Sequence, residues 1–197
     1  MERGRARGVV TAEGEHLGAD VVVSCVGHWT DELIALAGVR LPLAPTNGLL
    51  AISSPSPVRL RAMLHTHEVN LRADGAGRIL MRAGEFDRTV VPGTPVVPLP
   101  PACQQILARA IRVLPGLTGI RVESARVGVR PIPADGYPAV GPVPGVDGLY
   151  VVCTHSGVTL GPLLGRLVAQ ELMGGEADPR LERLRPARLT VTMDAER

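Results

Sequence analysis

Two continuous apolar runs divide the chain, and small or polar residues bound each of them. The first is Asp20–Val26 and the second is Leu149–Cys153. Hydrophobic residues that follow one another without alternation suit a strand that is covered on both faces, as in a parallel sheet. We therefore expect Leu149–Cys153 to be a buried strand and Asp20–Val26 to be a central parallel strand.

The second run passes through His155-Ser156-Gly157 into a segment with helical periodicity. Its apolar positions follow the i, i+3, i+4, i+7 spacing of one buried face, and they are Leu160, Leu163, Leu164, Leu167, Val168 and Leu172. Gly161 and Gly165 would let another backbone approach this helix, and Gly174-Gly175 would end it. A strand that enters a helix in this way leaves the first helical N–H groups unpaired, and such an end attracts anions and carbonyl oxygens.

Shorter elements precede and follow the first run. Residues 8–17 predict a hairpin that turns at Gly14, and Thr30 with Asp31 and Glu32 predicts the start of a helix that ends at Gly38. From Leu41 to Pro98 the pattern changes to prolines and short alternating runs, which are typical of antiparallel sheet. These runs are Leu49–Ile52, Val69–Leu71 and Ile79–Met81, with a turn at Asp74–Gly77.

The antiparallel region continues into one helix and one strand. Pro100-Pro101 opens a helix that Pro115-Gly116 closes, and its apolar residues are Ile106, Leu107, Ala110, Ile111 and Leu114. The strand Glu123–Val129 then leads into Arg130. The order of elements predicts an α/β chain with an antiparallel part inserted into a parallel one.

Composition excludes some classes of function. The 197 residues carry a net charge of +2, and all 21 basic residues are arginine. No stretch combines clustered arginines with the four aromatic residues, which excludes an ordinary nucleic-acid-binding surface. Cys25, Cys103 and Cys153 lie far apart, as reduced and buried thiols of a cytoplasmic protein do. No apolar segment approaches the length of a membrane span, so we expect no membrane span and a cytoplasmic chain.

Two local patterns carry little chemistry. His65-Thr66-His67 places two imidazoles on one strand face, but no third ligand stands at a fitting spacing, so we predict no metal site. His155-Ser156-Gly157 lacks the G-x-S-x-G pattern that a hydrolase nucleophile needs. Arg130 is the stronger candidate, because a guanidinium binds a carboxylate through two parallel hydrogen bonds. The residues alone leave open whether it clamps a substrate or pairs with an acid such as Asp135.

The last third of the chain resembles the FAD-dependent D-amino acid oxidase superfamily, which includes glycine oxidase, sarcosine oxidase and D-amino acid dehydrogenases. The matching residues are Arg130-Pro131, Asp135-Gly136-Tyr137-Pro138, Gly141, Gly148–Val152, His155-Ser156-Gly157, Thr159–Pro162 and Gly165. Cys25-Val26-Gly27-His28-Trp29 also resembles the family, which usually carries Ala-Ala-Gly-x-Trp there. From the residues alone, Gly27 and Trp29 also suit an ordinary turn and core packing.

The resemblance implies a partial FAD-binding domain of the Rossmann-like, glutathione-reductase type, with a mixed or antiparallel substrate domain inserted. It assigns residues 1–41 and 131–176 to the FAD-binding domain, 42–130 to the substrate domain and 177–197 to a C-terminal tail. It also implies that Arg130 binds the substrate carboxylate. The residues implied to contact FAD are Cys25, Gly27, Trp29, Gly157, Val158, Thr159 and Leu160. No acid–base catalyst is evident, since Tyr137 and His155 have no support for that role.

Two departures limit the resemblance. The family binds the ADP half of FAD through a G-x-G-x-x-G turn, and this chain has none; it corresponds to about the second half of a family member. At Pro45-Thr46-Asn47-Gly48, relatives usually carry an arginine before the glycine, so the resemblance supports no substrate contact from this turn.

Two hypotheses about function follow. The first is an FAD-dependent oxidoreductase that oxidises the CH–NH bond of an amino acid or secondary amine by hydride transfer. A partner chain with the missing half, or self-association, would complete it. The alternative is a non-catalytic remnant or interaction module that does not bind FAD by itself. A parallel sheet without its neighbouring strands exposes unpaired backbone, which favours association in either case.

Overall fold

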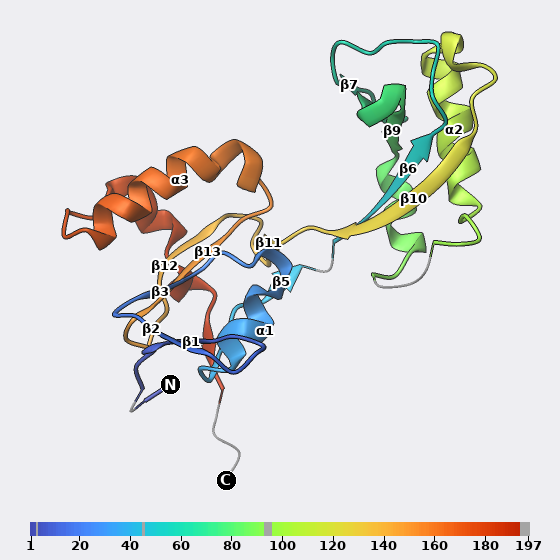
Figure 1. Ribbon diagram of the computed structural model, residues 1–197. Coiled ribbons are helices and arrows are strands. Elements are labelled where there is room, and N and C mark those ends of the chain that lie inside the picture. Colours follow the sequence, from blue (N-terminus) through green and yellow to red (C-terminus); the bar gives the residue numbers. More distant parts are fainter. Residues whose placement is uncertain (3, 45, 93–95, 194–197) are drawn as a thin grey trace. The chain divides into compact units, whose positions relative to one another are not determined.

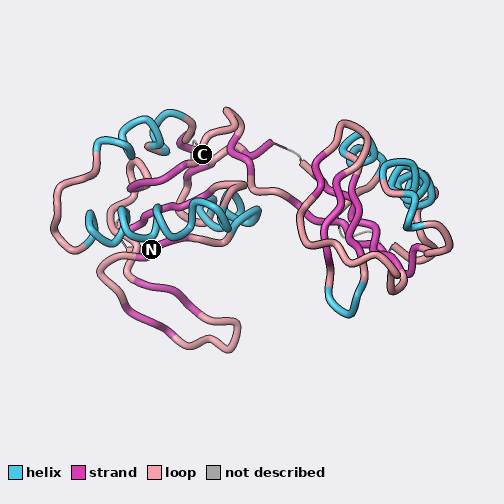
Figure 2. Tube along the Cα trace, turned by 90° about the horizontal axis from the view of Figure 1, so that it is seen from above, coloured by secondary structure: helices cyan, strands magenta, loops and turns pink. Residues whose placement is uncertain are grey.

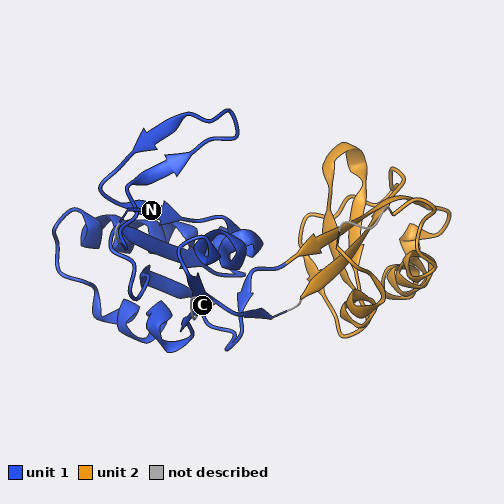
Figure 3. Ribbon diagram, turned by 90° about the horizontal axis from the view of Figure 1, so that it is seen from below, with its two compact units in different colours: residues 1–45, 130–197 blue, residues 46–129 orange. Residues whose placement is uncertain are grey.

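The computed structural model describes residues 1–2, 4–44, 46–92 and 96–193, and these form two compact units (Figure 1). Unit 1 comprises residues 1–45 and 130–197, and unit 2 comprises residues 46–129 (Figure 3). Unit 2 is thus inserted into unit 1, and both units contain helices and sheet. The expected α/β class with an inserted antiparallel part is confirmed.

A three-stranded sheet lies at the centre of unit 1. Its order is β12 (Ala139–Pro142), β13 (Leu149–Cys153) and β3 (Val22–Ser24). Strand β13 runs parallel to β3 and antiparallel to β12. The parallel strands expected from the two apolar runs are therefore confirmed. The central position expected for Asp20–Val26 was wrong within the described chain, because β3 ends the sheet and Val21 and Val23 are exposed.

Helices cover both faces of this sheet. Because neighbouring side chains of a strand point to opposite faces, Tyr150 packs with α3 (Gly157–Leu172), while Val151 packs with Ile34 of α1 (Thr30–Ala35). Only Leu164, Leu167 and Val168 of α3 are buried. The buried face of α3 is narrower than its periodicity predicted, since Leu163 and Leu172 are exposed.

Short elements complete unit 1. They are β1 (Gly8–Val10), β2 (His16–Gly18), η1 (Gly27–Trp29), β4 (Val39–Arg40), β5 (Leu43–Ala44), β11 (Ile132–Pro133), η5 (Pro179–Leu184), η6 (Pro186–Arg188) and β14 (Val191–Thr192). The expected hairpin is confirmed as β1 paired with β2, and it projects from the unit (Figure 2). The residues expected to form a C-terminal tail pack onto the unit up to residue 193: Leu181 is fully buried and β14 pairs with β4. Residues 194–197 lie outside the described residues.

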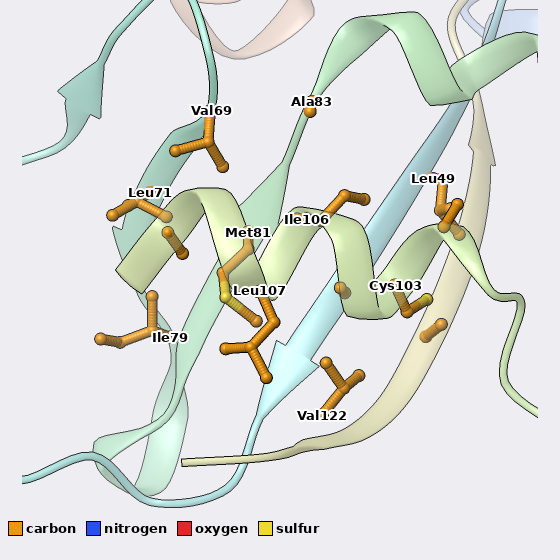
Figure 4. Packing of buried hydrophobic residues seen from close by; sticks show 14 of the residues in the cluster. Leu49, Val69, Leu71, Ile79, Met81, Ala83, Cys103, Ile106, Leu107 and Val122 are labelled. Carbon is orange, nitrogen blue, oxygen red and sulfur yellow. The ribbon is translucent and has the colours of Figure 1, made fainter. Parts of the chain in front are cut away.

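Unit 2 is an antiparallel sheet with one long helix on it. The strand order is β10 (Val122–Val129), β6 (Asn47–Ser53), β9 (Ile79–Arg82), β8 (Asn70–Ala73) and β7 (Leu64–His65). Helix α2 (Ala102–Val113) packs on one face through Ile106 and Leu107 (Figure 4). Ala110 of α2 belongs to the same core. Three 3-10 helices join these elements: η2 (Gly75–Gly77), η3 (Gly84–Thr89) and η4 (Pro115–Leu117). The antiparallel sheet and the helix expected from the sequence are confirmed.

No helix in the described parts of the chain is long and apolar enough to cross a membrane.

Candidate functional site

A cavity of 590 Å³ lies in unit 1 between β3 and α3. Helix α3 packs over β12 and β13, but it does not cover β3, so Val23 and Cys25 face open space beside it. The turn after β3, the start of α3 and Pro131 complete the lining. The cavity thus joins three segments that are far apart in the sequence.

The turn after β3 brings backbone to the edge of the cavity. Gly27 has φ +65°, a conformation that a side chain disfavours. Its carbonyl oxygen accepts a 2.6 Å hydrogen bond from the Thr30 hydroxyl, which fixes the turn at the start of α1. Cys25 was expected to be buried but is exposed here, because no further strand pairs with β3 in the described chain.

Cys153 ties this turn to the segment around Pro131. Its Sγ lies 3.8 Å from the carbonyl oxygens of both Gly27 and Pro131, and both geometries suit a thiol donor. Burial raises the pKa of Cys153, which keeps the proton on sulfur that these carbonyls accept. The thiol therefore joins two walls of the cavity and is not poised as a nucleophile.

The first turn of α3 forms the opposite wall. The Thr154 hydroxyl accepts a hydrogen bond from the Ser156 N–H, and no side chain caps the helix that follows. Added Cβ atoms at Gly157, Gly161 and Gly165 would meet no atom within 4 Å outside the helix's nearby backbone. This wall therefore combines a helix start without a side-chain cap and glycines without side chains, which suits a flat ligand that carries carbonyl oxygens.

Four of the seven residues predicted to contact a cofactor line this cavity: Cys25, Gly27, Gly157 and Val158. Trp29 does not. It stacks on His28, with ring centroids 3.7 Å apart, and lines a separate hollow on α1 with Leu33 and Leu36. Thr159 and Leu160 follow on α3 without lining the cavity, and Leu160 packs against the core instead.

The sequence reasoning missed several lining residues. Val152, Thr154, Leu164 and Val168 contribute to the cavity, although no motif singled them out for it. The sequence could have indicated them only through their location, because each lies at the end of β13 or on the face of α3 that turns to the sheet. His155, which also lines the cavity, bonds its own neighbour, since its Nδ1 lies 3.0 Å from the Ser156 Oγ.

Arg130 follows β10 directly, and Pro131 of the cavity wall comes next. Asp135, which the sequence offered as a structural partner for Arg130, binds Arg188 through two hydrogen bonds of 2.6 and 3.1 Å. The hydrogen bonds from Arg188 hold the pKa of Asp135 below its usual range. Arg188 also donates to the carbonyl oxygens of Tyr137 and Pro138, so η6 fixes this turn.

Two further expectations concern unit 2. His65 Nδ1 lies 3.1 Å from Asn70 Oδ1, and within the described residues no three His, Cys, Asp or Glu side chains gather as metal ligands would. Pro45 of the expected Pro45-Thr46-Asn47-Gly48 turn lies outside the described residues. Asn47 donates a 2.8 Å hydrogen bond to the Val90 carbonyl oxygen.

Comparisons with known proteins agree with one another. The family model described as FAD dependent oxidoreductase matches residues 1–171. The chain is 34% identical over 183 residues to a glycine oxidase of Pseudomonas putida, covering 89% of this chain and 47% of that protein. It is 33% identical to a D-amino acid dehydrogenase of Cereibacter sphaeroides, covering 92% of this chain and 41% of that protein.

Among solved structures, an iminodiacetate oxidase from Chelativorans sp. BNC1 is similar, with a TM-score of 0.70 and 27% identity. The match covers 90% of this chain and 48% of that one. The likeness confirms the expected fold class. The chain spans about half the length of the curated relatives that it matches.

Proposed function

The chain belongs to the FAD dependent oxidoreductase family, and on that premise we propose that it forms the substrate-binding and flavin-facing half of an oxidoreductase that acts on an amino acid or secondary amine. The cavity between β3 and α3 carries the proposal, because it joins the Gly27 turn to the uncapped start of α3. Unit 1 would contribute to FAD binding, and unit 2 would be the substrate domain.

The residues of the cavity fit a flavin ring. Glycines without Cβ contacts leave room for a flat ligand, and apolar side chains of β3 and β13 would line its face. FAD, when bound, supplies the acceptor for the hydride of the substrate CH–NH bond. The N–H groups of Gly157, Val158 and Thr159 would stabilise negative charge at a ring carbonyl. Cys25 and Gly27 line the same cavity, whereas Trp29 and Leu160 do not line it and belong to the proposed set on the family resemblance alone.

Arg130 is the proposed carboxylate clamp. Glycine, a D-amino acid and iminodiacetate, which the names of the relatives mention, each carry an amine and a carboxylate. Hydride transfer requires the substrate Cα at a fixed distance and angle, and a guanidinium that binds both carboxylate oxygens sets position and orientation together. The fork of Arg130 at the end of β10 would serve this purpose.

Completion by another polypeptide is part of the proposal. In the described chain, β3 pairs on one side only, and Trp29, Leu33 and Leu36 of the turn and helix after it are exposed. A chain that carries the G-x-G-x-x-G unit, or a second copy of this chain, would cover these groups. A cytoplasmic location is also proposed, and the three free cysteines support it.

The alternative is a module that does not bind FAD by itself, and the half-length match is the observation that favours it. An absorption spectrum of the purified chain, after incubation with FAD and desalting, separates the two. Retained flavin at about one equivalent supports a site that this chain completes alone or as an oligomer. If flavin is lost, the same measurement with the G-x-G-x-x-G half of a relative added decides. Loss in that case too would contradict the enzyme proposal.

Cys25 offers a second measurement on the same site. It is exposed and lines the cavity, whereas Cys103 is buried in unit 2. Iodoacetamide should label Cys25 first, and bound FAD should slow that labelling by at least about fivefold while Cys103 stays unreactive. Mass spectrometry of peptides measures both rates. In protein shown by its absorbance to retain FAD, an unchanged Cys25 rate would place the flavin elsewhere.

A further inference from the structure

The unit 2 sheet has a second face, opposite to α2, that carries arginines. Leu49, Met81 and Ala125 point into the core under α2, so the alternate positions point away from it. On that second face the central pair Ile52 and Leu80 is buried. Arg72, Ser124, Arg126 and Gly128 are exposed there.

Two paired glycines lie on this face close to two arginines; Gly128 is exposed, and Gly48 is buried. Gly48 of β6 is paired directly with Gly128 of β10, and neither carries a side chain. Arg126 stands two residues before Gly128 on the same face, opposite Leu50. Arg82 reaches the same place from β9, since its Nε is 3.9 Å from the position that a Gly48 Cβ would take.

A buried carboxylate holds Arg82 in position. Asp87 on η3 forms an ion pair with the Arg82 guanidinium, and its Oδ1 accepts a hydrogen bond of 3.1 Å from the Leu49 N–H. Asp87 therefore anchors both the strand and the arginine. The pair occupies one part of a guanidinium that has five N–H donors, so further donors remain to bind an anion.

The charges around this place leave an excess of positive charge. Asp87 offsets Arg82, and Glu123 pairs with Arg78 and Arg121. Asp74 lies 3.6 Å from Arg72. Within the described part of the chain, Arg126 forms no ion pair and is exposed. A guanidinium beside unsubstituted backbone has room to bind a carboxylate through two hydrogen bonds.

We propose that the surface formed by Gly128, Arg82 and Arg126, next to the buried Gly48, binds a carboxylate of the substrate side chain. This inference rests on the proposed function, in which unit 2 is the substrate domain. It names the substrate class: an amino acid or secondary amine with a second carboxylate. Arg82 and Arg126 are then specificity-determining residues, distinct from the clamp assigned to Arg130.

Direct binding to the 197-residue chain tests the surface without FAD. In a two-dimensional NMR titration at constant ionic strength, succinate should shift the Gly48 and Gly128 amide signals with a Kd on the order of 1–10 mM. Succinamide, its neutral diamide, should not shift them. Arg126→Gln and Arg82→Gln should each weaken succinate binding about fivefold or more. Arg112→Gln, which removes the same charge from α2, should leave it unchanged.

Equal responses to succinate and succinamide, or equal losses in Arg126→Gln and Arg112→Gln, would overturn the inference. The spectrum of each variant also reports its folding, so a misfolded Arg82→Gln is recognised and Arg126→Gln decides. The chain can fail to bind succinate and still retain flavin, and it can lose flavin and still bind succinate. The two proposals therefore fail separately.

The completed, flavin-loaded enzyme gives a second readout. Steady-state kinetics gives kcat/KM for aspartate and for asparagine, each as both enantiomers. For the enantiomer that the wild type oxidises, the ratio of kcat/KM for aspartate to kcat/KM for asparagine should exceed one. Arg126→Gln should lower that ratio about tenfold or more, chiefly through KM. A wild-type ratio below one, or a ratio that Arg126→Gln does not change, contradicts an acidic substrate.

Discussion

Asp31 is a single carboxylate that ties helix α1 to strand β4. It accepts hydrogen bonds of 2.8 and 2.9 Å from Arg40 Nε and one of 2.8 Å from the Leu41 N–H. These bonds, first of all those from Arg40, hold the pKa of Asp31 below its ordinary value. Because the folded pKa lies below the unfolded one, the stabilisation is complete above the unfolded pKa of about 3.9 and is lost as pH falls through the folded value.

Asp31→Asn should lower the free energy of unfolding at pH 7 by about 1–2 kcal/mol. The difference from wild type should shrink as pH falls below about 4, where the wild-type carboxylate takes up its proton. Urea unfolding at several pH values measures this. Glu85→Gln is the control, because Glu85 is an exposed partner of Arg109 and its loss should leave the free energy of unfolding nearly unchanged. A difference that does not vary with pH would show that the charge of Asp31 is unimportant.

Arg130 carries a prediction about substrate binding. In the completed enzyme, Arg130→Ala should raise KM for a carboxylated substrate by about one to three orders of magnitude, from loss of about 2–4 kcal/mol of charge-assisted hydrogen bonding. Arg121→Ala is the matched control, because Arg121 is exposed and pairs with Glu123 two residues away. Steady-state kinetics compares the three proteins. An unchanged KM in Arg130→Ala would remove the clamp role.

Among the elements, α3 has two faces with different tasks. Leu164, Leu167 and Val168 pack on the sheet, while Gly161 and Gly165 border open space. At the C-terminal end, Tyr150 donates a 2.9 Å hydrogen bond to Glu171, and Arg185 binds the same carboxylate. Burial is the first cause that raises the pKa of Tyr150 to about 12. The C-terminal end of α3 is therefore fixed by polar contacts, and its glycine side is left for another molecule.

Gly161→Ala should separate these two tasks. A Cβ at Gly161 meets no atom within 4 Å outside the helix's nearby backbone, and alanine favours a helix over glycine, so the variant chain should gain about 1 kcal/mol of stability. Flavin retention with the G-x-G-x-x-G half added should fall, because a side chain at Gly161 stands in the cavity and obstructs the flavin or the approach of that half. Thermal unfolding and flavin absorbance measure the two effects. Unchanged retention in Gly161→Leu, a larger obstruction, would mean that nothing docks on this side.

The whole molecule has separate hydrophobic cores in its two units. The core of unit 2 lies between α2 and the antiparallel sheet, and those of unit 1 lie on both faces of its three-stranded sheet. Each unit therefore has its own buried apolar surface to stabilise it. Trp29, the one tryptophan in the sequence, belongs to unit 1 and reports on that unit by its fluorescence.

Ile106→Ala, in the middle of α2, should destabilise unit 2 by about 2–4 kcal/mol. The unfolding transition followed by circular dichroism should shift or divide, while the Trp29 fluorescence transition stays in place. Ile34→Ala is the counterpart in unit 1, since Ile34 is fully buried, and it should shift the Trp29 transition. If both probes shift together in Ile106→Ala, the units unfold as one.

The elements that could be predicted are those that one local pattern specifies. The apolar run of β13, the periodicity of α2 and the hairpin at Gly14 all stand in short windows of sequence. Local spacing fixes the type of an element, because side-chain periodicity in strands and helices is a local property. The motifs between Arg130 and Gly165 also identified the family, but that identification rests on resemblance to known sequences and not on a physical rule.

Only the tertiary structure decided which segments meet. The pairing of β10 with β6 joins residues that are far apart in the sequence, such as Val129 and Asn47, and nothing local in either strand specifies that register. In the same way Cys153 joins Gly27 to Pro131, Asp135 binds Arg188, and Arg82 reaches over Gly48. Such contacts depend on backbone geometry and side-chain packing summed over the whole fold. The sequence by itself therefore determined the element types and the family, and the fold determined the cavity and the arginine-lined surface.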